Sequence, residues 1–191
     1  MDKIEVANKT SVEKAVMTLD EEGVVMHPTE TCYGLAVDVF HEATLRKLYF
    51  MKDMKEDKPL SILVDSMEMA QDYAVFSKKA LELAEKHWPG PLTIILPRTE
   101  NLPDYFNKGH DTVGVRISSS AFCCEMVSKL GEPVTTTSAN KSGEEPLYIP
   151  EVMGGVDLLV DGGVLTYQAP STIVRVVGDK VEVLRQGELQ L

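Results

Sequence analysis

Short runs of β-branched and aliphatic residues alternate along this chain with longer segments whose apolar residues recur at helical spacing. The short runs are typical of buried strands, and the three-to-four spacing is typical of amphipathic helices. Strands are expected at residues 23–28, 33–40, 59–64, 91–97, 112–117, 156–163, 171–178 and 180–187. Helices are expected at residues 10–22, 42–54, 67–74, 78–88 and 121–130. Such alternation predicts an α/β fold: an open, twisted, mixed β-sheet with flanking helices and a ligand cleft at strand ends.

Length and composition favour one domain over residues 1–191. The chain has 191 residues, 43% of them apolar, and shows no internal repeat or long linker. The first ten residues carry acids and no apolar core of a signal sequence, and no long uncharged apolar stretch follows. Its three cysteines form no CxxC pair and no zinc spacing, which fits a reducing cytoplasm. We therefore expect a cytoplasmic protein with no membrane segment and no metal-ligating residues of its own.

The charge balance restricts the partners. Against 19 Lys and Arg residues stand 30 Asp and Glu residues, which gives a formal net charge of -11. Such a charge disfavours broad, non-specific binding to nucleic acid. Any anion that the protein binds must meet a local cluster of positive side chains.

Two polar segments lie where ligands usually bind in α/β sheets. HPTETCYG (residues 27–34) and TTTSANKSG (residues 135–143) each follow a strand-like run and are rich in hydroxyls, an amide and glycine. Thr29, Ser138 and Asn140 can donate and accept hydrogen bonds over short distances. The alternative is that these residues only cap helices or close turns. Their occurrence in both segments favours a shared site.

Positive groups complete the picture of an anion site. Lys52 and Lys55 end a predicted helix, while Arg116 and Arg185 each follow a strand-like run. Charge-assisted donors of this kind suit a nucleotide phosphate. The alternatives are that Lys52 interacts with its helix dipole and that Arg116 forms a structural ion pair. No P-loop, GxGxxG, HExxH or GxSxG motif is present.

Six ordered blocks then point to a family. HPTETCYGL, WPGPLT, VGVRI, TTSANKSG, VDGG and PSTIV occur in this order between about residues 23 and 187. The set closely resembles the YrdC-like domain of threonylcarbamoyl-AMP synthases. The resemblance implies an L-threonylcarbamoyladenylate synthase, a nucleotidyltransferase that forms threonylcarbamoyl-AMP and pyrophosphate from L-threonine, bicarbonate and ATP. It also implies Mg²⁺ bound with ATP.

The product of that reaction serves the threonylcarbamoyl modification of adenosine 37 in tRNA. The implied partner is therefore a tRNA-modifying transferase complex that receives the product, with direct tRNA contact weak at most.

The resemblance also implies roles for seven residues of this chain. Catalysis would depend on Lys52 and Arg116. Threonine would contact Thr29 and Ser171. The nucleotide would contact Lys52, Ser138, Asn140 and Arg185.

One position departs from the family pattern. The family usually has an arginine two residues after the lysine, but this chain reads Lys52, Asp53, Met54, Lys55. Lys55 is therefore a candidate to compensate, as a point charge in place of a bidentate fork. Two alternatives stay open. One is a YciO-like paralogue of the same fold with altered or weak nucleotide-dependent activity, and the other is a non-catalytic RNA-binding module.

Overall fold

The computed structural model describes residues 2–5 and 9–191, with side chains from residue 10 onward. Its helices are α1 (Lys9–Asp20), α2 (Glu42–Met51), α3 (Met67–Tyr73), α4 (Lys78–His87) and α5 (Ala121–Leu130). Its strands are β1 (Asp2–Glu5), β2 (Val25–Pro28), β3 (Tyr33–Ala36), β4 (Ser61–Leu63), β5 (Leu92–Pro97), β6 (Thr112–Arg116), β7 (Val134–Ser138), β8 (Leu158–Asp161), β9 (Thr172–Val177) and β10 (Lys180–Arg185).

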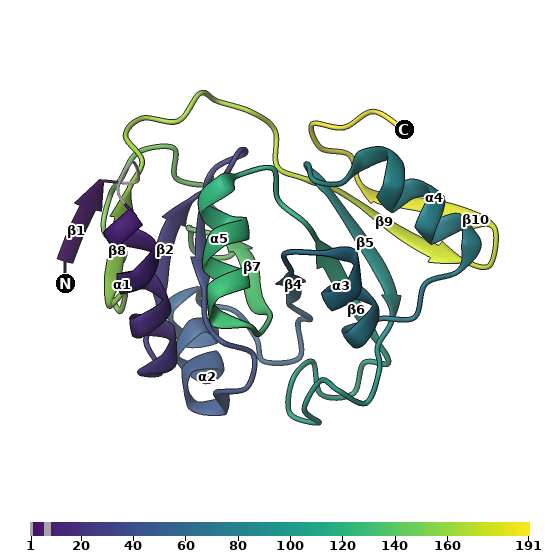
Figure 1. Ribbon diagram of the computed structural model, residues 1–191, viewed down its shortest axis with the longest axis horizontal. Coiled ribbons are helices and arrows are strands. Elements are labelled where there is room, and N and C mark those ends of the chain that lie inside the picture. The colour runs from purple at the N-terminus through teal and green to yellow at the C-terminus, as the bar shows by residue number, and fades with distance from the viewer. Residues whose placement is uncertain (1, 6–8) are drawn as a thin grey trace.

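The strands form one mixed sheet in the order β1-β8-β2-β3-β7-β4-β6-β5-β9-β10. The sheet contains parallel pairs such as β4 with β6 and antiparallel pairs such as β3 with β7. The two ends of the order, β1 and β10, lie at opposite sides of the molecule, so the sheet is open (Figure 1). The predicted α/β fold with an open mixed sheet and flanking helices is confirmed.

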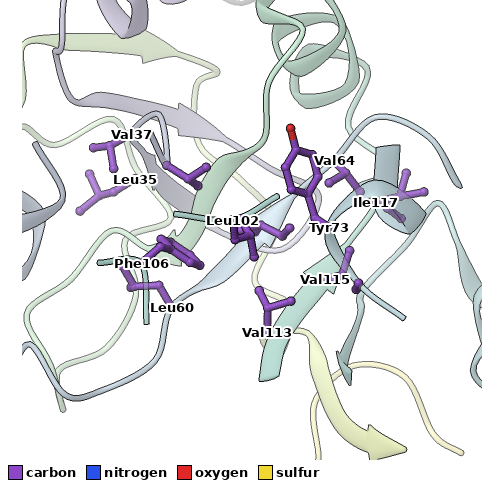
Figure 2. Close-up of a cluster of buried hydrophobic side chains, with 14 of the residues drawn as sticks. Leu35, Val37, Leu60, Val64, Tyr73, Leu102, Phe106, Val113, Val115 and Ile117 are labelled. Carbon is purple, nitrogen blue, oxygen red and sulfur yellow. The ribbon is translucent and has the colours of Figure 1, made fainter. Parts of the chain in front are cut away.

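Alternating strand residues divide between two hydrophobic clusters. On β2, Met26 belongs to the larger cluster together with residues of α2, whereas Val25 belongs to the smaller cluster with α1 and α5. Helices α1 and α5 lie side by side in front of the sheet in Figure 1. In the larger cluster, Leu102 and Phe106 come from the connection between β5 and β6 and insert among the strand residues (Figure 2).

Local signals explain several helix ends. The Ser66 and Ser77 hydroxyls cap α3 and α4 by accepting bonds from the N–H groups of Met69 and Ala80. Helix α5 ends at Gly131, whose φ of 78° is left-handed and suits glycine. No helix within residues 2–5 and 9–191 has the length and hydropathy needed to cross a membrane.

Two strands differ from the expectation, β1 and β7. Strand β1 (Asp2–Glu5) was not expected and pairs with β8 at the edge of the sheet. Residues 135–138 were expected to follow a strand, but they form most of β7 itself, in the middle of the sheet between β3 and β4. The Thr135 side chain is fully buried there, and its hydroxyl accepts a bond of 3.1 Å from the Val37 N–H. A buried hydroxyl with a backbone partner lets a polar sequence occupy an interior strand.

Candidate functional site

A cavity of about 300 Å³ lies against the middle of the sheet. Strand residues form its floor, among them Gly34, Ser61, Thr93, Thr137 and Ile173. It therefore extends over the strands as well as along their ends. All seven residues that the sequence predicted for the site line this cavity: Thr29, Lys52, Arg116, Ser138, Asn140, Ser171 and Arg185. The fold brings them together, while their individual binding roles stay predictions.

The cavity wall is strongly biased toward positive charge. Lys52, Lys58, Arg116 and Arg185 contribute four cationic groups, and none of the described wall residues is Asp or Glu. This concentration occurs in a protein with a net charge of -11. A site with these groups and many hydroxyls can bind a polyanion such as a nucleotide phosphate.

The Thr29 hydroxyl organises the turn between β2 and β3. It donates to the Cys32 carbonyl at 2.7 Å and accepts from the N–H groups of Thr31 and Cys32 at 3.0 and 3.2 Å. Thr29 thus holds the turn that faces the cavity. Thr29 therefore closes a turn, which was the alternative role for this segment, and it also lines the cavity.

Arg116, at the end of β6, is buried and forms an ion pair with Glu30 at 2.6 Å. Glu30 also accepts bonds from the Ser118 hydroxyl and the Ser119 N–H. Burial disfavours the Glu30 carboxylate, but Arg116 and Ser118 outweigh it and hold the pKa of Glu30 below its ordinary value. The ion pair considered for Arg116 is therefore present, and it fixes the guanidinium at the cavity. Sequence reasoning missed Glu30, whose only signal was its place between two cavity residues.

Ser171 and Arg185 contact each other directly. The Arg185 guanidinium donates to the Ser171 carbonyl at 2.7 and 3.0 Å and to its hydroxyl at 3.0 Å. The Ser171 hydroxyl also bonds with that of Thr93 at 3.1 Å. Burial, with a contribution from nearby Arg116, lowers the pKa of Arg185. The predicted threonine contact and the predicted nucleotide contact therefore form one unit.

Lys52 lies behind the segment at residues 138–143. Its ammonium donates to the Ser138 carbonyl at 2.5 Å and to the Asn140 carbonyl at 2.8 Å. The Ser138 hydroxyl donates to the Asn140 side-chain oxygen at 2.5 Å. Gly143 closes the segment with a φ of 93°, a left-handed conformation that favours glycine.

Lys55 does not line this cavity. It lies instead in a neighbouring groove of about 1240 Å³ between α2 and residues 141–155, which meets the cavity at Met54 and Asn140. The connection between α2 and β4 does bring another cation to the cavity. This is Lys58, whose Nζ lies 3.3 Å from the Ser142 hydroxyl. Sequence reasoning missed Lys58. The available signal was its position directly before Pro59, at the start of a predicted strand.

Among the residues that the structure describes, no three His, Cys, Asp or Glu side chains gather in a way that could hold a metal ion. Hydroxyl and amide oxygens are the uncharged ligands that the wall offers. They do not make up a dedicated Mg²⁺ site, which normally includes one or two carboxylates.

Comparisons with known proteins agree on one group of relatives. A family model with the name Sua5_yciO_yrdC and the description "Telomere recombination" matches residues 17–187. A protein of Methanocaldococcus jannaschii, provisionally assigned as a threonylcarbamoyl-AMP synthase, is 36% identical over 88% of this chain and 81% of its own length. The threonylcarbamoyl-AMP synthase of Pyrococcus abyssi is 32% identical over 90% of this chain, which spans about half (52%) of that protein.

Solved structures give the same picture. P. abyssi Sua5 complexed with L-threonine superposes with a TM-score of 0.91 at 28% identity, over 98% of this chain and 58% of that one. E. coli YciO superposes with a TM-score of 0.88 over 97% of this chain and 94% of its own length. At 24% identity, the likeness to YciO shows the fold alone.

Proposed function

Because the chain belongs to the Sua5/YciO/YrdC family, we propose that it is a threonylcarbamoyl-AMP synthase that uses the cavity at the middle of its sheet. The observation that carries this proposal is the cavity wall, where four cationic side chains meet Ser, Thr and Asn side chains without a carboxylate. Such a wall suits a triphosphate beside a small hydroxylated amino acid. The relatives named threonylcarbamoyl-AMP synthase and the threonine complex of P. abyssi Sua5 support the choice of substrates.

In the proposed reaction, the threonine amine nitrogen first bonds to the bicarbonate carbon, a carbon–oxygen bond of bicarbonate breaks, and water leaves with a proton from the amine, which gives a carbamate. A carbamate oxygen then attacks the α-phosphorus of ATP, the bond from that phosphorus to the bridging oxygen breaks, and pyrophosphate leaves. The enzyme is in this sense a nucleotidyltransferase. Positioning and charge neutralisation can supply the catalysis, so no covalent enzyme intermediate is needed.

The wall residues divide this work by their position. Arg116 is buried, and Arg185 is exposed on β10 but held at the wall by its bonds to Ser171, so these two guanidinium groups suit the carboxylate, carbamate and α-phosphate. Lys58 is exposed at the mouth and makes no ion pair with a described residue, so it suits the leaving pyrophosphate. Magnesium enters as part of the substrate MgATP, held by phosphate oxygens and water.

The test separates this function from a paralogue with another substrate. Pyrophosphate release is measured with ATP and bicarbonate, with threonine or 2-aminobutyrate as the amino acid. A site that pairs a substrate hydroxyl discriminates strongly against an analogue that lacks it, so threonine should be the much better substrate. Equal turnover of the two amino acids would contradict the threonine site, and release that needs neither would favour the YciO-like alternative.

Delivery of the product to a tRNA-modifying complex and a cytoplasmic location stay predictions. The same holds for direct tRNA binding, which the net charge of -11 disfavours. A gel shift with tRNA at two salt concentrations tests the latter.

A further inference from the structure

Lys52 connects the end of α2 to the segment at residues 138–143 through both its backbone and its side chain. Its carbonyl oxygen accepts a bond of 2.7 Å from the Ser142 N–H. Its ammonium donates to the carbonyl oxygens of Ser138 and Asn140, and it lies 3.4 Å from the Asn140 side-chain oxygen. Only 3% of the residue is exposed. Lys52 is therefore embedded in protein oxygen atoms.

The number of donors is decisive. A lysine ammonium has three N–H groups. Three oxygen atoms, one from Ser138 and two from Asn140, surround the Lys52 ammonium. While this arrangement holds, no donor is left for a phosphate. Lys58 contrasts with Lys52, because Lys58 is exposed and its ammonium has, within the described part of the chain, one neutral partner, the Ser142 hydroxyl.

The bonds made by Lys52 determine the shape of the segment. Two carbonyl groups, from Ser138 and Asn140, turn toward one buried charge, which compensates them for the loss of water. The Asn140 amide is then fixed on its other side by donating to the carbonyl oxygens of Lys141 and Glu144. Without the ammonium, the Asn140 carbonyl would lose its charged partner and the Ser138 carbonyl would keep the weaker bond from the Asn140 N–H at 3.1 Å, so the segment would rearrange.

We infer that Lys52 is a positioning residue: its ammonium holds residues 138–143 in their binding shape and does not itself contact phosphate. This inference rests on the proposed function only in taking Ser138 and Asn140 as nucleotide contacts. It revises the role that the family resemblance implied for Lys52, and it leaves the phosphates to Lys58 and the two arginines.

The first test is hydrogen exchange on the ligand-free protein, with Lys52→Met compared with Lys58→Met. Methionine keeps most of the side-chain length and removes the charge. The N–H groups of Ala139 and Ser142 are hydrogen-bonded, so their protection reports on the segment. We expect protection at residues 138–143 to fall at least ~10-fold in Lys52→Met and to stay within ~2-fold of wild type in Lys58→Met. Unchanged protection in Lys52→Met would overturn the inference.

The second test is calorimetric binding of AMP and of inorganic pyrophosphate to the same variants. A positioning role predicts that Lys52→Met weakens AMP and leaves pyrophosphate binding near wild type, while Lys58→Met does the reverse. Loss of pyrophosphate binding in Lys52→Met with AMP unaffected would show a direct phosphate contact and contradict us. If the wild type binds neither ligand, the proposed function fails, whereas the exchange experiment still decides the role of Lys52.

If Lys52→Met does not fold, the wild-type protein answers the question through pH. Burial, with a contribution from nearby Lys58, lowers the pKa of Lys52 to about 8, and the other titratable group that faces it is the Cys32 thiol. Above that pH the neutral amine loses its charge and one donor. Protection at residues 138–143, corrected for intrinsic exchange and divided by that of β6, should therefore fall between pH 7 and pH 9. A constant ratio would contradict the inference.

Discussion

Each cation of the cavity wall has a different partner, and the partner limits what the cation can do. Arg116 is paired with the Glu30 carboxylate, Arg185 with the Ser171 carbonyl, and Lys52 with the carbonyl groups of Ser138 and Asn140. Among the described residues, the Lys58 ammonium has only the Ser142 hydroxyl as a hydrogen-bond partner. The three cations with strong partners are suited to build the site, and Lys58 is the one suited to follow a mobile phosphate.

At this scale we first predict that Arg185→Ala weakens ATP and threonine binding together. Loss of a charge-assisted hydrogen bond costs about 1–3 kcal/mol, so the ATP affinity should fall roughly tenfold or more. Threonine binding should also weaken, because Arg185 fixes Ser171. Calorimetry on Arg185→Ala, Ser171→Ala and the double variant measures this coupling. Effects that simply add would show that the two residues act independently.

The second prediction concerns the connection from Met54 to Lys58. Preorganised charge acts on the transition state. Met54→Arg should therefore lower the activation free energy of pyrophosphate release by about 1–3 kcal/mol, which speeds the release roughly five- to a hundredfold. Lys58→Ala should slow it strongly. Lys55→Ala is the matched control, because Lys55 lies in the neighbouring groove, and it should have little effect. Single-turnover kinetics decides, and a crippled Lys55→Ala enzyme would restore Lys55 as the compensating residue.

At the scale of elements, the connection between β5 and β6 supports the cavity wall through Asn107, which binds Leu60 next to two wall residues. The Asn107 side chain is buried and binds both backbone groups of Leu60, accepting from its N–H and donating to its carbonyl at 2.8 Å each. It thus acts as a short strand partner just before β4. Lys58 and Pro59, two wall residues, directly precede this point.

We therefore predict that Asn107→Ala lowers the free energy of unfolding by about 2–4 kcal/mol, since two buried backbone groups lose their partner. Urea unfolding measures the change. Asn101→Ala is the control, because the Asn101 side-chain amide is exposed and donates to the Asp72 carbonyl, and its effect should be within about 0.5 kcal/mol. A loss as small as that of the control would contradict the supporting role of Asn107.

The elements also show what a sequence can predict. Residues 91–97 and 121–130 were expected as a strand and a helix, and β5 and α5 are found there, because apolar runs and a glycine stop are local signals. Strand β7 was misjudged, because its hydroxyls have partners that only the folded sheet supplies. Seven wall residues were predicted from motifs, but the wall residue Lys58 and the Arg116 partner Glu30 were not, since their roles depend on partners 84 and 86 residues away.

At the scale of the whole molecule, stability depends on a buried neutral histidine. His27 on β2 is 2% exposed and stacks on Phe122 with ring centroids 6.0 Å apart. Burial lowers the pKa of His27 from 6.5 to about 4. In the unfolded chain, His27 therefore binds a proton below pH 6.5, whereas in the folded chain it stays neutral down to about pH 4. The stability that neutral His27 contributes is fully present above pH 6.5 and is lost as the pH falls from 6.5 to about 4.

We predict that wild type loses about 2 kcal/mol more stability than His27→Gln between pH 7 and pH 5, a value that follows from the difference between the two pKa values. Urea unfolding at both pH values gives the two differences. The carboxylates titrate in both proteins, so the subtraction isolates His27. Equal losses would mean that His27 is protonated in the folded protein.

The claim that this cavity makes threonylcarbamoyl-AMP is tested most directly with ¹³C-labelled bicarbonate. The protein is incubated with ATP, threonine and the labelled bicarbonate, and the adenylate product is analysed by mass spectrometry. We predict a threonylcarbamoyl adenylate that carries the label, forms together with pyrophosphate and requires all three substrates. An adenylate without the label, or pyrophosphate release that does not depend on threonine and bicarbonate, would contradict the claim.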